Sequence, residues 1–251
     1  MIKPKVLVFS GYGLNCEEET KYAFEKAGGL ADIVHINDII DRSKVLNDYQ
    51  IFAMPGGFSY GDDTGSGNAF AQKIKNHLAE EFAKFLEKDI LGIGMCNGFQ
   101  ILANLGVFGQ IALLPNESAR YVTRWVDLEV EGKTPWLAGI DSLSLPIAHG
   151  EGRFYIPEHP RQPTRLTVDW QMALKYVRGE ICELENLPGN PNGSMDDIAG
   201  VTDKTGRILG LMPHPERAVS ATQLPHWFAP KKTSPEGPGL QIFKNAVNYF
   251  L

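Results

Sequence analysis

The first part of the chain alternates between short apolar runs and longer amphipathic stretches. The apolar runs are bounded by glycine, proline or polar residues, which is typical of buried strands, and they cover residues 6–9, 33–36, 50–54 and 90–95. The amphipathic stretches repeat apolar residues at helical spacing and cover residues 17–26, 70–86 and 97–105. We expect Asn15 to cap the first of these helices and Gly106 to end the third. Alternating strands and helices predict an α/β fold with a doubly wound, mostly parallel sheet and flanking helices on both faces.

The pattern changes after Gly106, where apolar and polar residues alternate as in antiparallel strands with one solvent-facing side. We expect such strands over residues 120–131, 143–148 and 172–177, and a hairpin formed by residues 198–202 and 207–212. A proline-rich loop over residues 225–239 and a closing helix over residues 240–251 follow. The whole chain, residues 1–251, is therefore expected to form a single domain whose sheet has an added antiparallel segment.

Composition narrows the class of protein. The 251 residues are 43% hydrophobic, which is sufficient for a substantial core, and the net charge of −6 argues against a general nucleic-acid or acidic-membrane partner. No apolar run approaches the ~20 residues that span a bilayer, and the segment from Met1 to Lys5 lacks the apolar core of a signal peptide. Three widely spaced cysteines without metal-ligand spacing indicate reduced thiols in the cytoplasm and no metal site.

One cysteine lies where a predicted strand meets a predicted helix. Cys96 follows the apolar run, and Gly94 and Gly98 stand two residues away on each side, so the backbone is free to turn sharply. The dipole of a helix favours the thiolate form of a cysteine at its N-terminus, and the N–H of Asn97 would face a developing oxyanion. The serine elbow of hydrolases uses the same strand–nucleophile–helix turn. Because cysteine is also among the most buried residue types, a packing role for Cys96 stays open at this point.

A cysteine nucleophile needs a base, and the base needs an orienting group. Two of the six histidines have a glutamate two residues later, His149 with Glu151 and His214 with Glu216. Residues i and i+2 of an extended segment point to the same side, so either glutamate is placed to hold its imidazole. The second pair is the better candidate, because it follows the predicted strand over residues 207–212 and because prolines on both sides of His214 restrict the backbone. For either pair, the alternative is a surface histidine near a carboxylate.

A glycine-rich loop over residues 55–62 follows the predicted strand over residues 50–54. Such a loop leaves backbone N–H groups free at the carboxyl end of a strand, where open α/β sheets bind ligands. A plain glycine–proline turn is the alternative. Gly11 and Gly13 match part of a dinucleotide-binding fingerprint, but Cys16 occupies the third glycine position, so an ordinary turn is the preferred interpretation.

These segments together resemble a known family. The segments from Gly94 to Gln100 and from Pro213 to Glu216 are similar to those of the class I (triad) glutamine amidotransferases. The finer pattern resembles the glutaminase subunits of phosphoribosylformylglycinamidine synthase, an enzyme of purine biosynthesis. The segments with this narrower resemblance are 13–17, 55–62, 149–154, 192–194, 198–200 and 212–217. Two features depart from the family pattern: Leu14 stands where a small or threonine-like residue is expected, and the proline-rich segment from His226 to Pro238 is longer than in compact members.

The resemblance implies a glutaminase mechanism. Cys96 would attack the side-chain amide of glutamine, His214 would protonate the departing ammonia, and Glu216 would orient His214. Water activated by His214 would then hydrolyse the γ-glutamyl thioester.

The resemblance also implies a set of substrate-binding residues. The backbone N–H groups of Gly57 and Asn97 are expected to form the oxyanion hole, and Gln100 is expected to help bind glutamine. No metal is expected to take part.

Partners follow from the same resemblance. The ammonia would pass to a separate large formylglycinamidine synthetase subunit, which would use ATP and Mg²⁺ to convert formylglycinamide ribonucleotide to the amidine. No Walker pattern appears in this chain, so we expect no cofactor here. A small third subunit is expected in the complex, and neither nucleic acid nor a membrane is expected as a partner.

Three other functions agree with parts of the sequence: a peptidase-like cysteine hydrolase on the same sheet, a non-catalytic scaffold that only binds its partner, and an amidotransferase of another pathway. The order of Cys96 and the His-Pro-Glu segment, together with the loop over residues 55–62, favours an amidotransferase. The segments 13–17 and 149–154 favour the purine pathway, but only by resemblance. The role of Cys16, either packing or lining the glutamine pocket, stays open.

Overall fold

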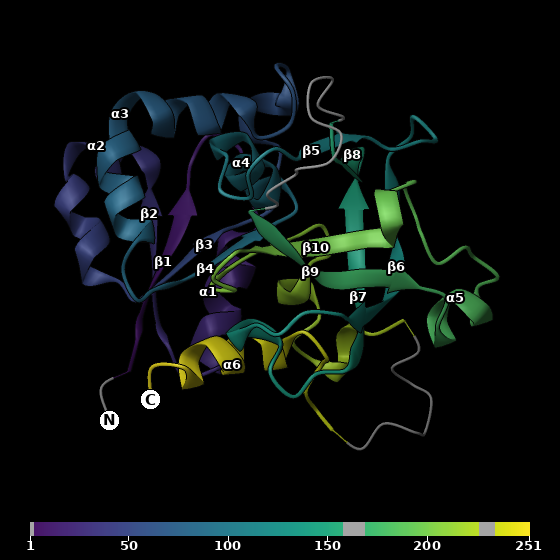
Figure 1. Ribbon diagram of the computed structural model, residues 1–251. Helices are drawn as coiled ribbons and strands as arrows, with labels where there is room; N and C mark the ends of the chain where they lie inside the picture. Colours follow the sequence, from purple (N-terminus) through teal and green to yellow (C-terminus); the bar gives the residue numbers. More distant parts are fainter. Residues whose placement is uncertain (1–2, 158–168, 226–233) are drawn as a thin grey trace.

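A central sheet of nine strands organises the computed structural model, which describes residues 3–157, 169–225 and 234–251 (Figure 1). The strand order is β2-β1-β3-β4-β11-β10-β9-β6-β7. The bounds of these strands are β1 Lys5–Ser10, β2 Leu30–His35, β3 Ile51–Met54, β4 Leu91–Met95, β6 Val122–Val130, β7 Ser142–His149, β9 Trp170–Val177, β10 Ile198–Asp203 and β11 Ile208–Leu211. Residues 226–233 of the predicted proline-rich loop lie outside the described residues.

The sheet has a parallel part and an antiparallel part. Strands β2, β1, β3, β4 and β11 are parallel neighbours. From β11 onward, β10, β9, β6 and β7 pair antiparallel. The predicted fold class, a mostly parallel doubly wound sheet with an added antiparallel segment, is confirmed. The apolar pattern does not predict the second sheet, formed by β5 (Ala112–Pro115) and β8 (Glu151–Tyr155), because each strand is short and pairs with a distant segment.

The bounds of the helices are α1 Glu17–Lys26, α2 Ile36–Asp41, α3 Asn68–Leu86, α4 Asn97–Leu105, α5 Glu180–Leu184 and α6 Leu240–Asn248. The four predicted helices are present as α1, α3, α4 and α6, whereas α2 and α5 were not predicted. Short 3₁₀ helices are η1 Ser43–Asp48, η2 Ser59–Asp62, η3 Pro135–Leu137, η4 Met195–Asp197, η5 Pro215–Arg217 and η6 Ala221–Gln223. Helix α4 ends as predicted at Gly106, whose φ of 83° is a conformation that glycine adopts readily.

Two local predictions were wrong. The predicted strand over residues 33–36 ends at His35, because the Nδ1 atom of His35 accepts the N–H of Asn37 and caps α2. Asn15 does not cap α1, because Cys16 occupies the N-cap position and the N–H of Asn15 donates instead to the carbonyl of Gly56. The start of α1 is therefore bound to the loop after β3.

Two apolar cores lie on opposite faces of the sheet. Helices α1 and α6 cover one face, and α2, α3 and α4 cover the other (Figure 1). The predicted apolar face of α3 is buried in the second core through Phe70, Ile74, Leu78, Phe82 and Phe85. In the first core, the ring of Phe243 on α6 contacts the ring of Phe24 on α1 edge to face at a centroid distance of 4.9 Å.

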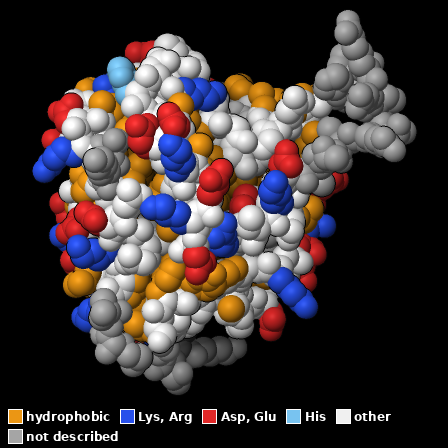
Figure 2. All heavy atoms as spheres, turned by 60° about the vertical axis from the view of Figure 1, so that its left-hand side comes forward, with side chains coloured by type: hydrophobic (Ala, Val, Ile, Leu, Met, Phe, Trp, Pro, Cys, Tyr) orange, Lys and Arg blue, Asp and Glu red, His pale blue; other side chains and the backbone are white. Residues whose placement is uncertain are grey.

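The surface shown in Figure 2 has acidic and basic side chains interspersed between apolar and other side chains. Such mixing is usual on hydrated protein surfaces, and the net charge of −6 is moderate for 251 residues. None of the helices in the described ranges combines the length and the apolar character that crossing a membrane requires.

The packing of α6 on α1 leads to a stability prediction. Phe243→Ala should lower the free energy of unfolding by about 3–5 kcal/mol, because a buried aromatic side chain is lost and a cavity is left. Urea denaturation measures this change. The control is Leu184→Ala on α5, where the side chain is 65% exposed and the expected change is within about 0.5 kcal/mol. Equal losses in the two variants would contradict this account of the core.

Candidate active site

Cys96 lies at the sharp turn between β4 and α4. It is the N-cap residue of α4 and has φ 52° and ψ −107°, a conformation that a residue with a Cβ atom rarely adopts. Its N–H donates to the carbonyl of Leu211 at 2.8 Å, and its side chain is 6% exposed. Strained backbone of this kind occurs mainly at functional sites, because the surrounding structure must stabilise it. The predicted strand–cysteine–helix turn is therefore present.

The glycines on both sides of Cys96 allow this turn to pack. A Cβ atom on Gly98 would overlap the carbonyl oxygen of Met54 on β3. A Cβ atom on Gly94 would approach the carbonyl oxygen of Gly98 to 2.7 Å. The first turn of α4 is thus pressed against the ends of two strands, which only glycine at these positions permits.

Parallel pairing brings His214 to the same edge of the sheet as Cys96. Leu211 of β11 is in register with Met95 of β4, so the residues that follow both strands leave the sheet together. The backbone of His214 is held by a hydrogen bond from its N–H to the carbonyl of Pro146 at 2.8 Å.

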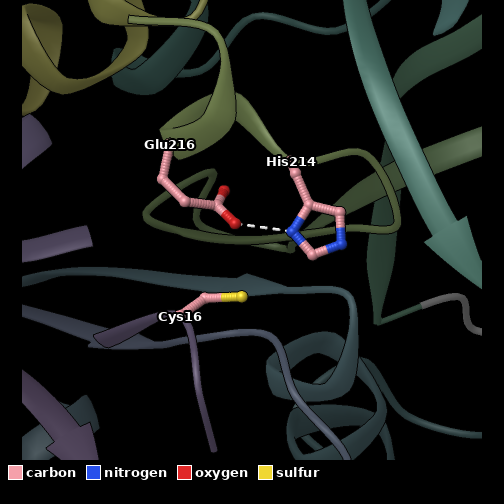
Figure 3. A group of neighbouring side chains, drawn as sticks. All are labelled: Cys16, His214 and Glu216. Carbon is pink, nitrogen blue, oxygen red and sulfur yellow. Dashed lines mark hydrogen bonds and ion pairs between the residues drawn. The ribbon is translucent and has the colours of Figure 1, made fainter. Parts of the chain in front are cut away.

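The imidazole of His214 is paired with Glu216, as predicted, but the extended geometry expected for this segment was wrong, because Pro215–Arg217 form the 3₁₀ helix η5 and His214 is its N-cap residue. The Nδ1 atom of His214 lies 2.5 Å from the Oε1 atom of Glu216, and both side chains are buried (Figure 3). The other ring nitrogen, Nε2, is buried and has no hydrogen-bond partner in the described part of the chain. This nitrogen is therefore available for a reacting group.

Electrostatics favour the imidazolium form of His214. Burial by itself would lower the pKa of His214, but the carboxylate of Glu216 and the thiols of Cys96 and Cys16 outweigh burial and raise this pKa well above its usual value. The imidazole ring of His214 can therefore keep its proton close to the sulfur of Cys96. A protonated imidazole in this place is a proton donor next to a group that can act as a nucleophile.

The loop after β3 is held in one orientation by the start of α1. The carbonyl of Gly56 accepts hydrogen bonds from the N–H groups of Asn15 at 3.1 Å and Cys16 at 3.2 Å. In a planar trans peptide the following N–H points the opposite way, so the N–H of Gly57 is directed away from these donors. Gly57 itself has φ 154°, and a Cβ atom there would overlap the carbonyl of Gly13. The predicted oxyanion donor is thus fixed in space, while its catalytic role stays a prediction.

The side chains of Asn97 and Gln100 support the same loop. Asn97 accepts the N–H of Ser59 at 3.1 Å and donates to the Oε1 atom of Gln100 at 2.9 Å. Gln100 in turn donates to the carbonyl of Glu151 at 2.9 Å. The backbone N–H of Asn97 lies in the first turn of α4, where a helix offers no intrahelical acceptor, so this group is placed to serve an oxyanion. Gln100 lines a cavity of about 290 Å³ together with Glu151, Ser66 and others, and its predicted part in glutamine binding stays a prediction.

The alternative pair, His149 and Glu151, does not form. The Nδ1 atom of His149 lies 3.0 Å from the Oδ1 atom of Asn116, and a carboxylate oxygen of Glu151 accepts the N–H of Ser66 instead. Burial, together with the charge of His214, lowers the pKa of His149 to about 4. His149 is thus a buried, neutral histidine, whereas His214 is the charged one.

Two residues near the triad had no assigned role in the sequence. The sulfur of Cys16 lies 2.8 Å from the Nη2 atom of Arg217, and the Nε atom of Arg217 lies 3.7 Å from the Oε1 atom of Glu216. The sequence signal for these two residues was that they lie in the family-like segments 13–17 and 212–217. A contact between two segments so far apart in the chain cannot be predicted from a local sequence pattern.

The comparison with protein families identifies the class of protein. The model described as "CobB/CobQ-like glutamine amidotransferase domain" matches residues 3–250. The chain therefore belongs to this family of glutamine amidotransferases.

Individual relatives narrow the match. The chain is 47% identical to phosphoribosylformylglycinamidine synthase subunit PurQ of Methanococcus maripaludis, over 100% of this chain and 99% of the relative. It is 41% identical to the protein of the same name in Dehalococcoides mccartyi, over 99% and 98% of the two chains. It superimposes on a chain of the PurLQS structure from Thermotoga maritima with a TM-score of 0.76, 33% identity and complete coverage of both chains. The predicted family, including the narrower resemblance to the glutaminase subunits of phosphoribosylformylglycinamidine synthase, is confirmed.

The neutral state of His149 leads to a prediction about pH. Because the pKa is about 4 in the folded protein and ~6.5 in an unfolded chain, the unfolded state binds the extra proton between these values. Stability from this group is therefore present above pH ~6.5 and is lost as the pH falls. Between pH 7 and pH 5, the wild type should lose about 2 kcal/mol more unfolding free energy than His149→Gln, measured by urea denaturation at both pH values. Equal losses of unfolding free energy in the two proteins would contradict this prediction, because they would show that His149 is protonated as easily in the folded protein as in the unfolded chain.

Proposed function

We propose that this chain is the glutaminase subunit of phosphoribosylformylglycinamidine synthase and that Cys96, His214 and Glu216 are its catalytic residues. The chain hydrolyses glutamine to glutamate and ammonia, and the ammonia is used in purine biosynthesis. The observation that supports this assignment most directly is the placement of a strained cysteine and a buried histidine–glutamate pair directly after the ends of the parallel neighbours β4 and β11.

The first half-reaction forms a thioester. The thiolate of Cys96 attacks the carbonyl carbon of the glutamine side-chain amide, and the carbonyl oxygen becomes an oxyanion. The backbone N–H groups of Gly57 and Asn97 stabilise that oxyanion. As the intermediate collapses, the C–N bond breaks and the imidazolium of His214 donates its proton to the leaving nitrogen, which departs as ammonia.

The second half-reaction regenerates the enzyme. A water molecule gives a proton to the now neutral His214 and attacks the thioester carbonyl carbon. The C–S bond breaks, glutamate is released and the thiolate of Cys96 returns. Glu216 holds His214 in one tautomer and stabilises the imidazolium in both half-reactions, as its 2.5 Å contact with Nδ1 allows.

Partners complete the reaction. In the proposal, ammonia passes to a large formylglycinamidine synthetase subunit that uses ATP and Mg²⁺, with a small third subunit in the complex. The name PurLQS of the similar structure from Thermotoga maritima supports this arrangement. The proposal also places the protein in the cytoplasm, because free cysteines without disulfides are typical of a reducing compartment.

Ammonia release from glutamine tests the proposal. The assay uses the wild type and Cys96→Ala, each with and without the synthetase subunits, ATP, Mg²⁺ and formylglycinamide ribonucleotide. We expect release that depends on Cys96 and rises when the partner is added. Cys182→Ala is the control, because Cys182 is a buried cysteine on α5 and should leave release unchanged.

The same assay separates the alternatives. Ammonia release that depends on Cys96 but does not change when the partner is added would assign the protein to another pathway. Absence of glutamine turnover in every mixture would contradict the proposal, and the non-catalytic scaffold and the peptidase-like hydrolase would then be the remaining functions. Covalent labelling of Cys96 by a glutamine analogue then distinguishes an amidotransferase from a peptidase.

Glu216 provides a second test through its effect on His214. Glu216→Gln should lower kcat by about 10²–10⁴-fold, because the imidazolium loses its buried counter-charge. The pKa of His214 should fall, so activity should be lost at lower pH on the alkaline side of the pH–kcat profile. The control is Glu80→Gln on the exposed face of α3. An unchanged alkaline limb would contradict the assigned role of Glu216.

A further inference from the structure

A second cysteine lies directly against the histidine–glutamate pair. The sulfur of Cys16 and one ligating atom each of His214 and Glu216 all lie within 4.8 Å of one another (Figure 3). The side chain of Cys16 is 1% exposed. This sulfur therefore lies beside the pair and is shielded from solvent together with it.

Cys16 is held there by the loop that contains the proposed oxyanion donor. Its N–H donates to the carbonyl of Gly56 at 3.2 Å, and its own carbonyl accepts the N–H and the hydroxyl of Thr20 in the first turn of α1. A Cβ atom on Gly56 would lie 3.4 Å from the sulfur of Cys16 and 2.7 Å from the Cε1 atom of His214. Gly56 is thus packed between the thiol and the imidazole.

Arg217 connects the thiol to the carboxylate. Its Nη2 atom donates to the sulfur of Cys16 at 2.8 Å, and its Nε atom lies 3.7 Å from Glu216. Burial by itself would lower the pKa of Arg217, but contact with Cys16 and the charge of Glu216 outweigh it, so this pKa is raised. The guanidinium is therefore a fixed positive charge between two groups that accept hydrogen bonds.

The three ligating atoms could in principle hold a metal ion, but two contacts argue against it. The guanidinium of Arg217 already occupies a position 2.8 Å from the sulfur, and a cation there would be repelled. The Nδ1 atom of His214 and the Oε1 atom of Glu216 already satisfy each other at 2.5 Å. The cluster is better explained as a support for the triad.

We propose that Cys16 and Arg217 form one positioning unit that holds the Glu216 carboxylate and the oxyanion peptide of Gly56 and Gly57 in a fixed relation to each other. This inference rests on the proposed glutaminase function. Through its side chain, Cys16 anchors Arg217 beside Glu216, and through its N–H it anchors the carbonyl of Gly56. Both the proton donor and the oxyanion donor are then aligned from a single residue at the start of α1.

The reconstituted complex with the synthetase subunits and nucleotides tests this unit. Cys16→Ala and Arg217→Met should each lower kcat for glutamine hydrolysis by about 10- to 100-fold with KM for glutamine little changed, because a small misalignment affects the transition state most. The double variant should be no worse than the poorer single variant, because the two side chains act together. Cys16→Ser should recover most of the activity, because the hydroxyl also accepts the hydrogen bond from Arg217.

The pH–kcat profile gives a readout that simple destabilisation would not change. Cys16 helps to raise the pKa of His214, so the alkaline limb of Cys16→Ala should move to lower pH. Cys182→Ala is the matched control, a buried cysteine beside Arg124 and Asp127 that should keep the wild-type profile. Thermal melting identifies variants that fail to fold. If Cys16→Ala fails to fold, the kcat values and pH profiles of Cys16→Ser and Arg217→Met test the proposal instead.

The results that would contradict the positioning unit differ from those that would contradict the proposed function. The positioning unit alone is overturned if activity of the wild type depends on Cys96 while Cys16→Ala and Arg217→Met keep the wild-type kcat and pH profile. Additive losses in the double variant would also overturn it. Absence of Cys96-dependent turnover in the wild type would instead contradict the proposed function.

Discussion

The site depends on the parallel pairing of β4 with β11. This pairing places Cys96 and His214 after neighbouring strand ends, although long stretches of sequence separate them. The hydrogen bond from the N–H of Cys96 to the carbonyl of Leu211 holds the strained turn to the strand that leads to His214. Because strand ends in a packed sheet move little, the proposed nucleophile and base need no loop closure to meet. The antiparallel strands that follow extend the sheet on the far side of β11, so this pairing is central.

Charge balance is the second condition for the site. Buried ions are stable only when they are paired, and here the carboxylate of Glu216 lies between the imidazole of His214 and the guanidinium of Arg217. The sulfur of Cys16 accepts a hydrogen bond from the same guanidinium. His149, by contrast, faces the amide of Asn116 and stays neutral. The same kind of side chain thus has opposite protonation in two positions because their neighbours differ.

Local sequence patterns predicted the elements that are defined by periodicity. The bounds of α1, the apolar face of α3 and the turn at Cys96 follow from spacing and glycine alone. His214 and Glu216 were found because two prolines and an i, i+2 relation are visible in the sequence. The capping role of His35, the β5–β8 pairing and the contact of Cys16 with Arg217 were not predictable, because each depends on side-chain geometry or on the meeting of distant segments.

The positive φ of Cys96 has an energetic consequence for the whole molecule. An L-residue in this conformation raises the free energy of the folded state, and packing elsewhere in the sheet must compensate for it. The residue proposed to perform the chemistry is therefore one of the least favourable for stability. Glycine would suit the backbone better at this position, but it has no thiol. Stability and the proposed reactivity are in direct opposition at this single residue, so selection for a more stable fold alone would remove the proposed nucleophile.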